Sequence, residues 1–250
     1  MDGTLLNSHK QMPSDFKSWV VNHNDIITVI ASGRQYYALA RDFMDIRDHL
    51  IFIAENGSLV FQDGEIIYQN LMNTEDVIVV LEHLKKVPYA TPLLCGVKSA
   101  YMEKSADEEM LHATMYYERL EQVDDLMEVA RKEKIVKLAI YFRMQMAEKS
   151  AYYFSSLPSN LKAVVSGVSW IDVANADANK GKALKEIQEQ NHISWNESMA
   201  FGDYFNDVEM LEQVKYSYAT ANAHPKIKKI VSYLTDSNDD DGVMKVLRNL

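Results

Sequence analysis

Short β-branched runs alternate with amphipathic helical stretches at both ends of the chain, and this alternation constrains the fold most. Ile26–Ala31 and Ile51–Ala54 have the pattern of continuous apolar strands, and Gln35–Leu50 between them carries apolar residues at helical spacing. The same alternation returns from Gly181 to Leu250. Strands without polar alternation are typical of parallel sheets that helices cover on both faces. We therefore predict an α/β core with a Rossmann-like parallel sheet.

The middle of the chain breaks this pattern. Gln62-Asp63-Gly64 separates two apolar runs, and an Asp-Gly step in that position is a strong signal of a β-hairpin. Strand and helix patterns in mixed order follow as far as about residue 170. We therefore predict two domains, a core formed by residues 1–59 and 171–250 and an inserted α+β cap at 60–170.

Composition limits the location and the partners of the protein. The net charge of −10 disfavours binding to nucleic acid, since such binding depends on phosphate neutralisation by Lys and Arg. The apolar runs are too short to cross a membrane, and the polar stretch Asn7–Gln11 lies where a signal peptide needs an apolar segment. We expect a cytoplasmic monomer or homodimer that binds neither nucleic acid nor a membrane.

Two candidate site segments lie in the first part of the chain. Asp2-Gly3-Thr4 offers a carboxylate and a hydroxyl, which suit metal binding or proton transfer but also an ordinary turn. Ser32-Gly33-Arg34 follows a predicted strand and precedes a predicted helix. A Ser hydroxyl with helix N-terminal N–H groups can bind an anion, although a simple Ser N-cap has the same sequence.

Two further segments lie in the last part. Asn179-Lys180-Gly181 opens a helix, where an ammonium group can neutralise a phosphate oxygen or can be an ordinary surface charge. Gly202 through Asp207 follows an apolar strand and contains Asp203, Asn206 and Asp207. Two carboxylates and an amide at a strand end suit Mg²⁺, which prefers oxygen ligands. A turn that caps the next helix explains Asn206 without requiring Asp203.

Taken in order, the four segments resemble the motifs of the haloacid dehalogenase-like hydrolases, and more narrowly those of the Cof-like sugar-phosphatase branch. Further matching segments are Ala54-Glu55-Asn56-Gly57 before the insert and Asp240-Asp241-Gly242-Val243 near the end. The resemblance spans nearly the whole chain, and it implies that the insert is a cap of type C2. It also implies a Mg²⁺-dependent phosphatase whose partner is a small phosphorylated metabolite.

The resemblance further implies a role for each matching residue. Ser32 and Lys180 would bind the transferring phosphoryl group, and Asp2 would be the general acid and base. At the metal site, Asp203 would ligate Mg²⁺ with Asp207 supporting it, and the backbone carbonyl of Asp2 would also face the metal. The phosphate and substrate-binding set would be Ser32, Gly33, Arg34, Asn56, Lys180 and Asn206.

The sequence departs from the family pattern at its start. The family motif is Asp-x-Asp-Gly-Thr after an apolar strand, and its first Asp attacks phosphorus to form an aspartyl-phosphate. Met1 takes the x position, so the nucleophile and its strand are not among these residues. An upstream start and a true truncation both explain this, and loss of the strand would leave two buried strands without ladder partners. The alternatives are a phosphosugar mutase or phosphotransferase and, for a true truncation, a catalytically dead ligand-binding protein.

Overall fold

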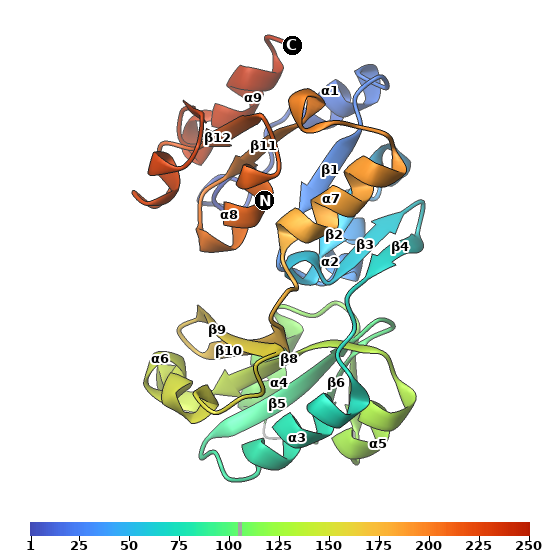
Figure 1. Cartoon of the computed structure of the whole chain (residues 1–250), viewed down its shortest axis with the longest axis vertical. Helices are drawn as coiled ribbons and strands as arrows, with labels where there is room; N and C mark the ends of the chain where they lie inside the picture. The colour runs from blue at the N-terminus through green and yellow to red at the C-terminus, as the bar shows by residue number, and fades with distance from the viewer. Residues whose placement is uncertain (105–106) are drawn as a thin grey trace. The chain divides into compact units, whose positions relative to one another are not determined.

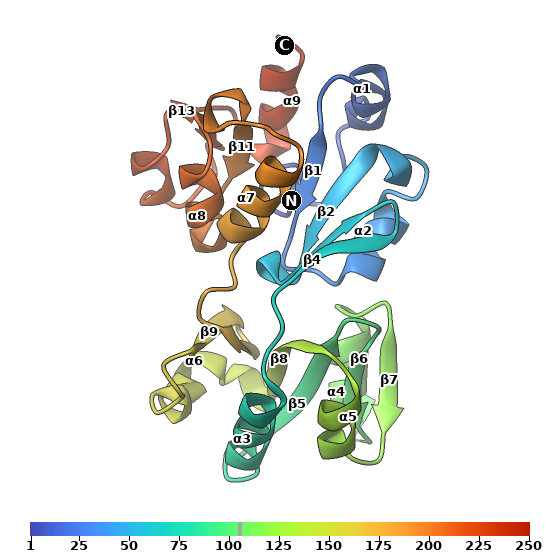
Figure 2. The same ribbon diagram turned by 45° about the vertical axis from the view of Figure 1, so that its right-hand side comes forward.

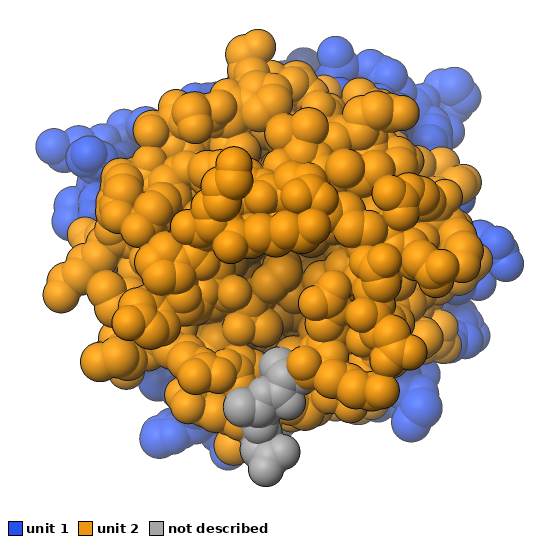
Figure 3. All heavy atoms as spheres, turned by 90° about the horizontal axis from the view of Figure 1, so that it is seen from below, with its two compact units in different colours: residues 1–36, 42–68, 179–250 blue, residues 37–41, 69–178 orange. Residues whose placement is uncertain are grey.

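The computed structural model describes residues 1–104 and 107–250, which form two compact units. The first unit contains residues 1–36, 42–68 and 179–250, and the second contains residues 37–41 and 69–178, coloured separately in Figure 3. Within the described residues, no helix is long and apolar enough to cross a membrane.

Two separate sheets form the centre of the first unit. One has the order β1-β2-β3-β4, with β1 and β2 parallel and β3 antiparallel to β2, and the other is the parallel sheet β11-β12-β13. The strands are β1 (Thr28–Ala31), β2 (Leu50–Ala54), β3 (Leu59–Gln62), β4 (Glu65–Gln69), β11 (Met199–Gly202), β12 (Tyr216–Ala219) and β13 (Tyr233–Leu234). The parallel α/β prediction is confirmed, although the parallel strands are divided between the two sheets.

Four α-helices lie in this unit, and a fifth, α2, has only its end residues Tyr36 and Asp42 in it (Figures 1 and 2). They are α1 (Phe16–Asn22), α2 (Tyr36–Asp42), α7 (Lys180–Gln190), α8 (Val208–Glu212) and α9 (Gly242–Leu247). Short 3₁₀ turns are η1 (Arg47–His49), η2 (Glu55–Gly57), η5 (Trp195–Glu197), η6 (Phe205–Asp207), η7 (Ile227–Lys229) and η8 (Asn238–Asp240). Every residue of β2 is buried, and Ala183 and Ile187 of α7 pack against Ile51 and Ile53. This packing fixes the start of α7 close to the end of β2.

The second unit contains a mixed sheet in the order β7-β6-β5-β8-β10-β9. Its elements are α3 (Thr74–Leu84), β5 (Ala90–Gly96), β6 (Ala100–Glu103), α4 (Asp107–Thr114), β7 (Leu120–Val123), α5 (Leu126–Lys132), β8 (Ile135–Phe142), η3 (Arg143–Gln145), α6 (Ala147–Ser150), η4 (Ala151–Phe154), β9 (Leu161–Gly167) and β10 (Trp170–Asn175). In α3, Val77, Val80, Leu81 and Leu84 recur at helical spacing and pack on one face of this sheet. The α+β character predicted for the insert is confirmed.

Both domain boundaries lie later than the sequence suggested. The predicted core ended at residue 59, but β3 pairs antiparallel with β2, so the hairpin remains in the first unit as far as Tyr68. The predicted core resumed at residue 171, but β10 pairs with β8 and β9 inside the second unit, which ends at Ala178. Strand pairing therefore decides both boundaries.

Candidate functional site

All four predicted segments lie in the first unit, and three of them follow a strand or begin a helix. Ser32 and its neighbours follow β1, η2 follows β2, Lys180 is the first residue of α7, and Asp203 follows β11. Ligands of open α/β sheets bind at the carboxyl ends of the strands. The local fold therefore gathers residues that are up to about 200 positions apart in sequence, as the Thr4–Asp203 contact shows.

Ser32 lies at the end of β1 and is buried. Its backbone N–H donates to the carbonyl of Ile53, and its hydroxyl oxygen accepts from the backbone N–H of Arg34 at 3.2 Å. Helix α2 begins only at Tyr36, so Ser32 is not its N-cap residue. The hydroxyl hydrogen of Ser32 can therefore be donated to an incoming anion.

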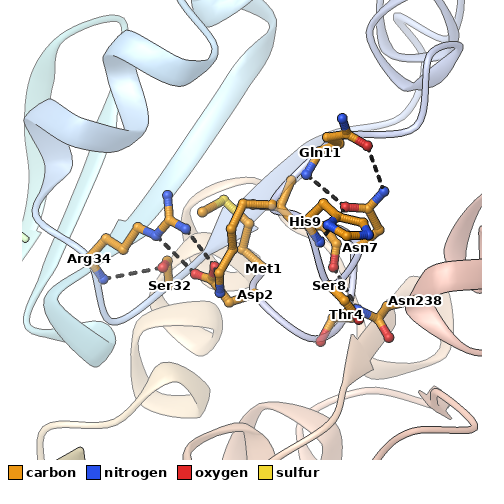
Figure 4. Close-up of polar contacts among 12 residues, drawn as sticks. Met1, Asp2, Thr4, Asn7, Ser8, His9, Gln11, Ser32, Arg34 and Asn238 are labelled. Carbon is orange, nitrogen blue, oxygen red and sulfur yellow. Dashed lines mark hydrogen bonds and ion pairs between the residues drawn. The ribbon is translucent and has the colours of Figure 1, made fainter.

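Arg34 binds two carboxylates, those of Asp2 and Asp42, and Figure 4 shows its contact with Asp2. Its Nε and Nη2 donate to the Asp2 carboxylate at 2.9 and 2.5 Å, and its Nη1 donates to Asp42 at 3.1 Å. Lys10 adds a second cation at 2.9 Å from Asp2. Burial acts to raise the pKa of Asp2, but hydrogen bonds from Lys10 and Arg34 outweigh it and lower the pKa. Asp2 is therefore held as an ionised carboxylate.

Lys180 and Asp207 form a buried ion pair. The Lys180 Nζ lies 2.7 Å from Asp207 Oδ1, and the two side chains are 3% and 5% exposed. The other oxygen of Asp207 accepts from the backbone N–H groups of Asp203 and Tyr204. Burial acts to raise the pKa of Asp207, but the charge of Lys180 outweighs it and the pKa is lowered. Asp207 therefore positions both Lys180 and the loop that carries Asp203.

Asp203 has an environment that disfavours its charge. Its Oδ1 accepts a hydrogen bond from the Thr4 hydroxyl at 2.6 Å, and the backbone of Gly3 closes over the other oxygen. A Cβ at Gly3, whose φ is +69°, would lie 2.4 Å from Asp203 Oδ2. Burial and the neighbouring charge of Asp207 hold the pKa of Asp203 above its usual value despite the Thr4 bond. A bound cation would relieve this cost.

Asn56 and Asn206 connect the remaining segments. The side chain of Asn206 donates to Asn56 Oδ1 at 3.1 Å, and a Cβ at Gly33 would lie 2.9 Å from that same oxygen. Gly57 has φ +98°, and a Cβ there would lie 2.2 Å from the carbonyl oxygen of Asn179. The structure therefore brings the Ser32 segment, η2, the start of α7 and the Asp203 loop into mutual contact.

The described residues supply only part of a metal site. Among residues 1–104 and 107–250, no three His, Cys, Asp or Glu side chains are grouped as metal ligands. The side chains of Asp2, Asp203 and Asp207 are not grouped, because the Asp2 carboxylate binds Arg34 and the Asp207 carboxylate binds Lys180. Asp203 is the carboxylate of this set whose chemistry fits a cation best, because its pKa is raised by burial.

A largely apolar cavity of about 690 Å³ lies between β1 and β11. It is lined by all of β1, by Met199–Phe201 and by side chains of α1, α7 and α9. Within the described residues β1 pairs only with β2, and β11 pairs only with β12. The N-terminus lies between β1 and β11 in both views (Figures 1 and 2), and the Met1 amine donates to the Ala31 carbonyl. Among the described residues, β1 and β11 are therefore edge strands, each with one ladder partner.

Sequence reasoning missed several contributors to the site. Lys10 binds Asp2, Asn222 donates to the Gly3 carbonyl, and the His224 backbone N–H donates to the Asp203 carbonyl. No sequence pattern distinguishes these residues, because each reaches the site only through the tertiary fold.

Comparison with known proteins agrees with this geometry. The model of the haloacid dehalogenase-like hydrolase family matches residues 1–247. The chain is 29% identical to the 5-amino-6-(5-phospho-D-ribitylamino)uracil phosphatase YbjI of Escherichia coli, with 99% of this chain and 92% of that protein covered.

Solved structures share the fold over the whole length. SMU.1108c from Streptococcus mutans is 28% identical with a TM-score of 0.86, and the coverage is 100% of this chain and 96% of that one. The subclass IIB sugar phosphatase BT4131 is 21% identical with a TM-score of 0.79, covering 100% and 96%. The fold is thus an α/β core with a separate cap sheet of type C2. The chain belongs to the haloacid dehalogenase-like hydrolases and is by family a phosphatase.

Proposed function

We propose that this protein hydrolyses small phosphate monoesters, either sugar phosphates or phosphorylated cofactors, with Mg²⁺ as the cofactor. One observation carries the proposal, the buried ion pair of Lys180 and Asp207. Asp207 accepts a hydrogen bond from the backbone N–H of Asp203, and Gly57 of η2 lies against the backbone at the start of α7, next to Lys180. A buried ammonium held in a fixed position is suited to the charge that develops during phosphoryl transfer.

Each residue has a proposed role. The Ser32 hydroxyl donates to a phosphoryl oxygen, and the Lys180 ammonium neutralises another. Mg²⁺ would be held by the Asp203 carboxylate and the Asp2 backbone carbonyl, and would supply further charge neutralisation. Since both oxygens of Asp207 already accept hydrogen bonds, its proposed role is to position Lys180.

Asp2 is the proposed general acid and base. Its carboxylate is held by Arg34 and Lys10, so it is ionised and ready to accept a proton. An incoming phosphate competes with Asp2 for Arg34, which would release the carboxylate toward the reacting oxygen. Gly33, Asn56 and Asn206 would line the substrate side of the site.

The proposed reaction passes through an aspartyl-phosphate, so it needs the family nucleophile. That aspartate would stand immediately before Met1, and the cavity between β1 and β11 has the position expected for the strand that precedes it. Strands rise about 3.3 Å per residue, so a strand beside the whole of β1 needs only four or five residues. We propose that turnover requires this carboxylate.

A phosphatase screen tests the proposal. Phosphate release is measured with and without Mg²⁺ for sugar phosphates, phosphorylated cofactors and the ribitylaminouracil phosphate named for the Escherichia coli relative. The printed chain is compared with a chain extended at Met1 by an apolar strand ending in Asp. We expect release only from the extended chain, and we expect Asp203→Asn to abolish it while Asp45→Asn, at an exposed ion pair, does not.

Other outcomes separate the alternatives. Phosphate transferred to a second sugar instead of water would indicate a mutase or phosphotransferase. If both chains bind the ester but neither releases phosphate from it, the protein is a ligand-binding protein. Release that is indifferent to both Mg²⁺ and Asp203→Asn would refute the proposed mechanism. We further propose that the protein works in the cytoplasm as a monomer or homodimer.

A further inference from the structure

Three aromatic rings gather beside Asp203 without belonging to the core. Tyr204 and Phe205 are 55% and 43% exposed, and their ring centroids lie 5.1 Å apart in a perpendicular arrangement. The His224 ring lies 4.6 Å from Phe205 and 6.1 Å from Tyr204. Lys226 places its ammonium 5.8 Å from the centre of the Phe205 ring. We call Tyr204, Phe205 and His224 the aromatic platform.

The aromatic platform is rigidly attached to the phosphate site. The His224 backbone N–H donates to the Asp203 carbonyl at 2.9 Å, and the Tyr204 N–H donates to Asp207 Oδ2 at 3.3 Å. The next residue, Asn206, donates to Asn56 at the opposite side of the loop. The platform therefore holds its position relative to any phosphate that binds at Lys180.

Packing does not explain why these rings are there. Met210, Leu211 and Ala223, which flank the platform in sequence, are buried in a hydrophobic cluster, whereas Tyr204 and Phe205 are exposed. Exposed Tyr and Phe rings beside a polar site favour a ligand with a flat apolar face, because stacking removes ring surface from water. A cation at the rim adds attraction for a π system.

We propose, on the basis of the proposed phosphatase function, that the aromatic platform binds a planar aromatic ring in the leaving group of the ester. The substrate class is then a phosphate ester that carries a ring system in addition to its phosphate-bearing chain. Tyr204 and Phe205 select this class, and a simple sugar phosphate of the same charge leaves the platform uncovered.

Calorimetric titration of this 250-residue chain with two matched ligands, in the presence of Mg²⁺, tests this inference by comparing their affinities. Riboflavin 5′-phosphate and ribitol 5-phosphate share the phosphate and the chain and differ by the ring. We expect riboflavin 5′-phosphate to bind at least about tenfold more tightly, a ratio that corresponds to about 1.4 kcal/mol. The double change Tyr204→Ala and Phe205→Ala should remove this ratio and leave ribitol 5-phosphate binding unchanged.

Controls make each outcome decisive. Trp195→Ala removes another exposed ring of the first unit and should preserve the ratio. If the double variant does not fold, Phe205→Leu keeps most of the volume and should still reduce the ratio. Equal affinity of the two esters, or a ratio that survives removal of both rings, overturns the inference. A failure of the proposed phosphatase function can be told apart from a failure of this inference. If the site does not bind phosphate, Ser32→Ala will change the affinity of neither ester.

Discussion

Replacing Asp207 with Asn would leave a buried ammonium without its counter-charge. Lys180 is 3% exposed and lies 2.7 Å from Asp207, so water cannot replace the lost carboxylate. Removing one partner of a buried ion pair typically costs about 3–5 kcal/mol of folding free energy. Asp207 Oδ2 also accepts two backbone hydrogen bonds, and an Asn that keeps both with its carbonyl oxygen would turn its NH₂ group toward the Lys180 ammonium. We therefore expect a loss of about 3–5 kcal/mol.

The matched control lies on the same helix. Lys185 and Glu189 are 3.7 Å apart on α7, and their side chains are 59% and 62% exposed. Such a solvated pair contributes at most about 1 kcal/mol, so Glu189→Gln should have a small effect. Urea unfolding at pH 7 measures both variants, with the m value checked for a constant two-state transition. An Asp207→Asn loss no larger than that of Glu189→Gln would refute the reasoning.

The ion pair of Lys180 and Asp207 should also make the folding stability depend on pH. Lys180 holds the pKa of Asp207 below its usual value despite burial. The stabilisation is therefore fully present above the unfolded-state pKa, about 3.9, and disappears as the pH falls through the folded-state pKa. Unfolding measured at pH 7 and at successively lower pH should show the difference between the natural chain and Asp207→Asn narrowing only below about pH 4. A difference that stays constant in acid would contradict this assignment.

Three further predictions concern the same unit. Gly57→Ala should cost more folding free energy than Gly64→Ala in urea unfolding. Both positions have positive φ, but only a Cβ at Gly57 would collide with backbone atoms. Equal losses would show that the strained φ alone sets the cost. Arg34→Gln should raise the pKa of Asp2 in a carboxyl NMR titration, and an unchanged pKa would show that Arg34 does not hold the charge. Asp203→Asn should raise the melting temperature without metal, since burial raises the pKa of Asp203 and its charge is therefore unfavourable at pH 7; a lower melting temperature would contradict this.

The hairpin β3–β4 shows why local sequence placed the domain boundary incorrectly. Its Asp63-Gly64 turn is visible in the sequence, and the structure confirms the two strands. The sequence does not show which sheet the hairpin joins, because pairing with β2 is a contact between strands. The predicted core resumed at residue 171, inside β10, for a similar reason, since only the pairing with β8 assigns this strand to the second unit.

The sequence by itself determined the alternation of strands and helices and the family motifs, and it supplied Ser32, Lys180, Asp203 and Asp207 as candidate site residues. These are local properties, because apolar periodicity and short motifs depend only on residues that are close together in the sequence. Only the tertiary structure decided what these residues contact. It showed Asp207 holding Lys180 and Arg34 holding Asp2.

The structure also revealed features that no motif records. The cavity between β1 and β11 and the aromatic platform beside Asp203 both depend on segments that are distant in sequence. The physical reason is that burial, ion pairing and ring contacts are set by neighbours in space. Sequence periodicity specifies the elements, whereas packing specifies which side chains meet and which polar groups lose water.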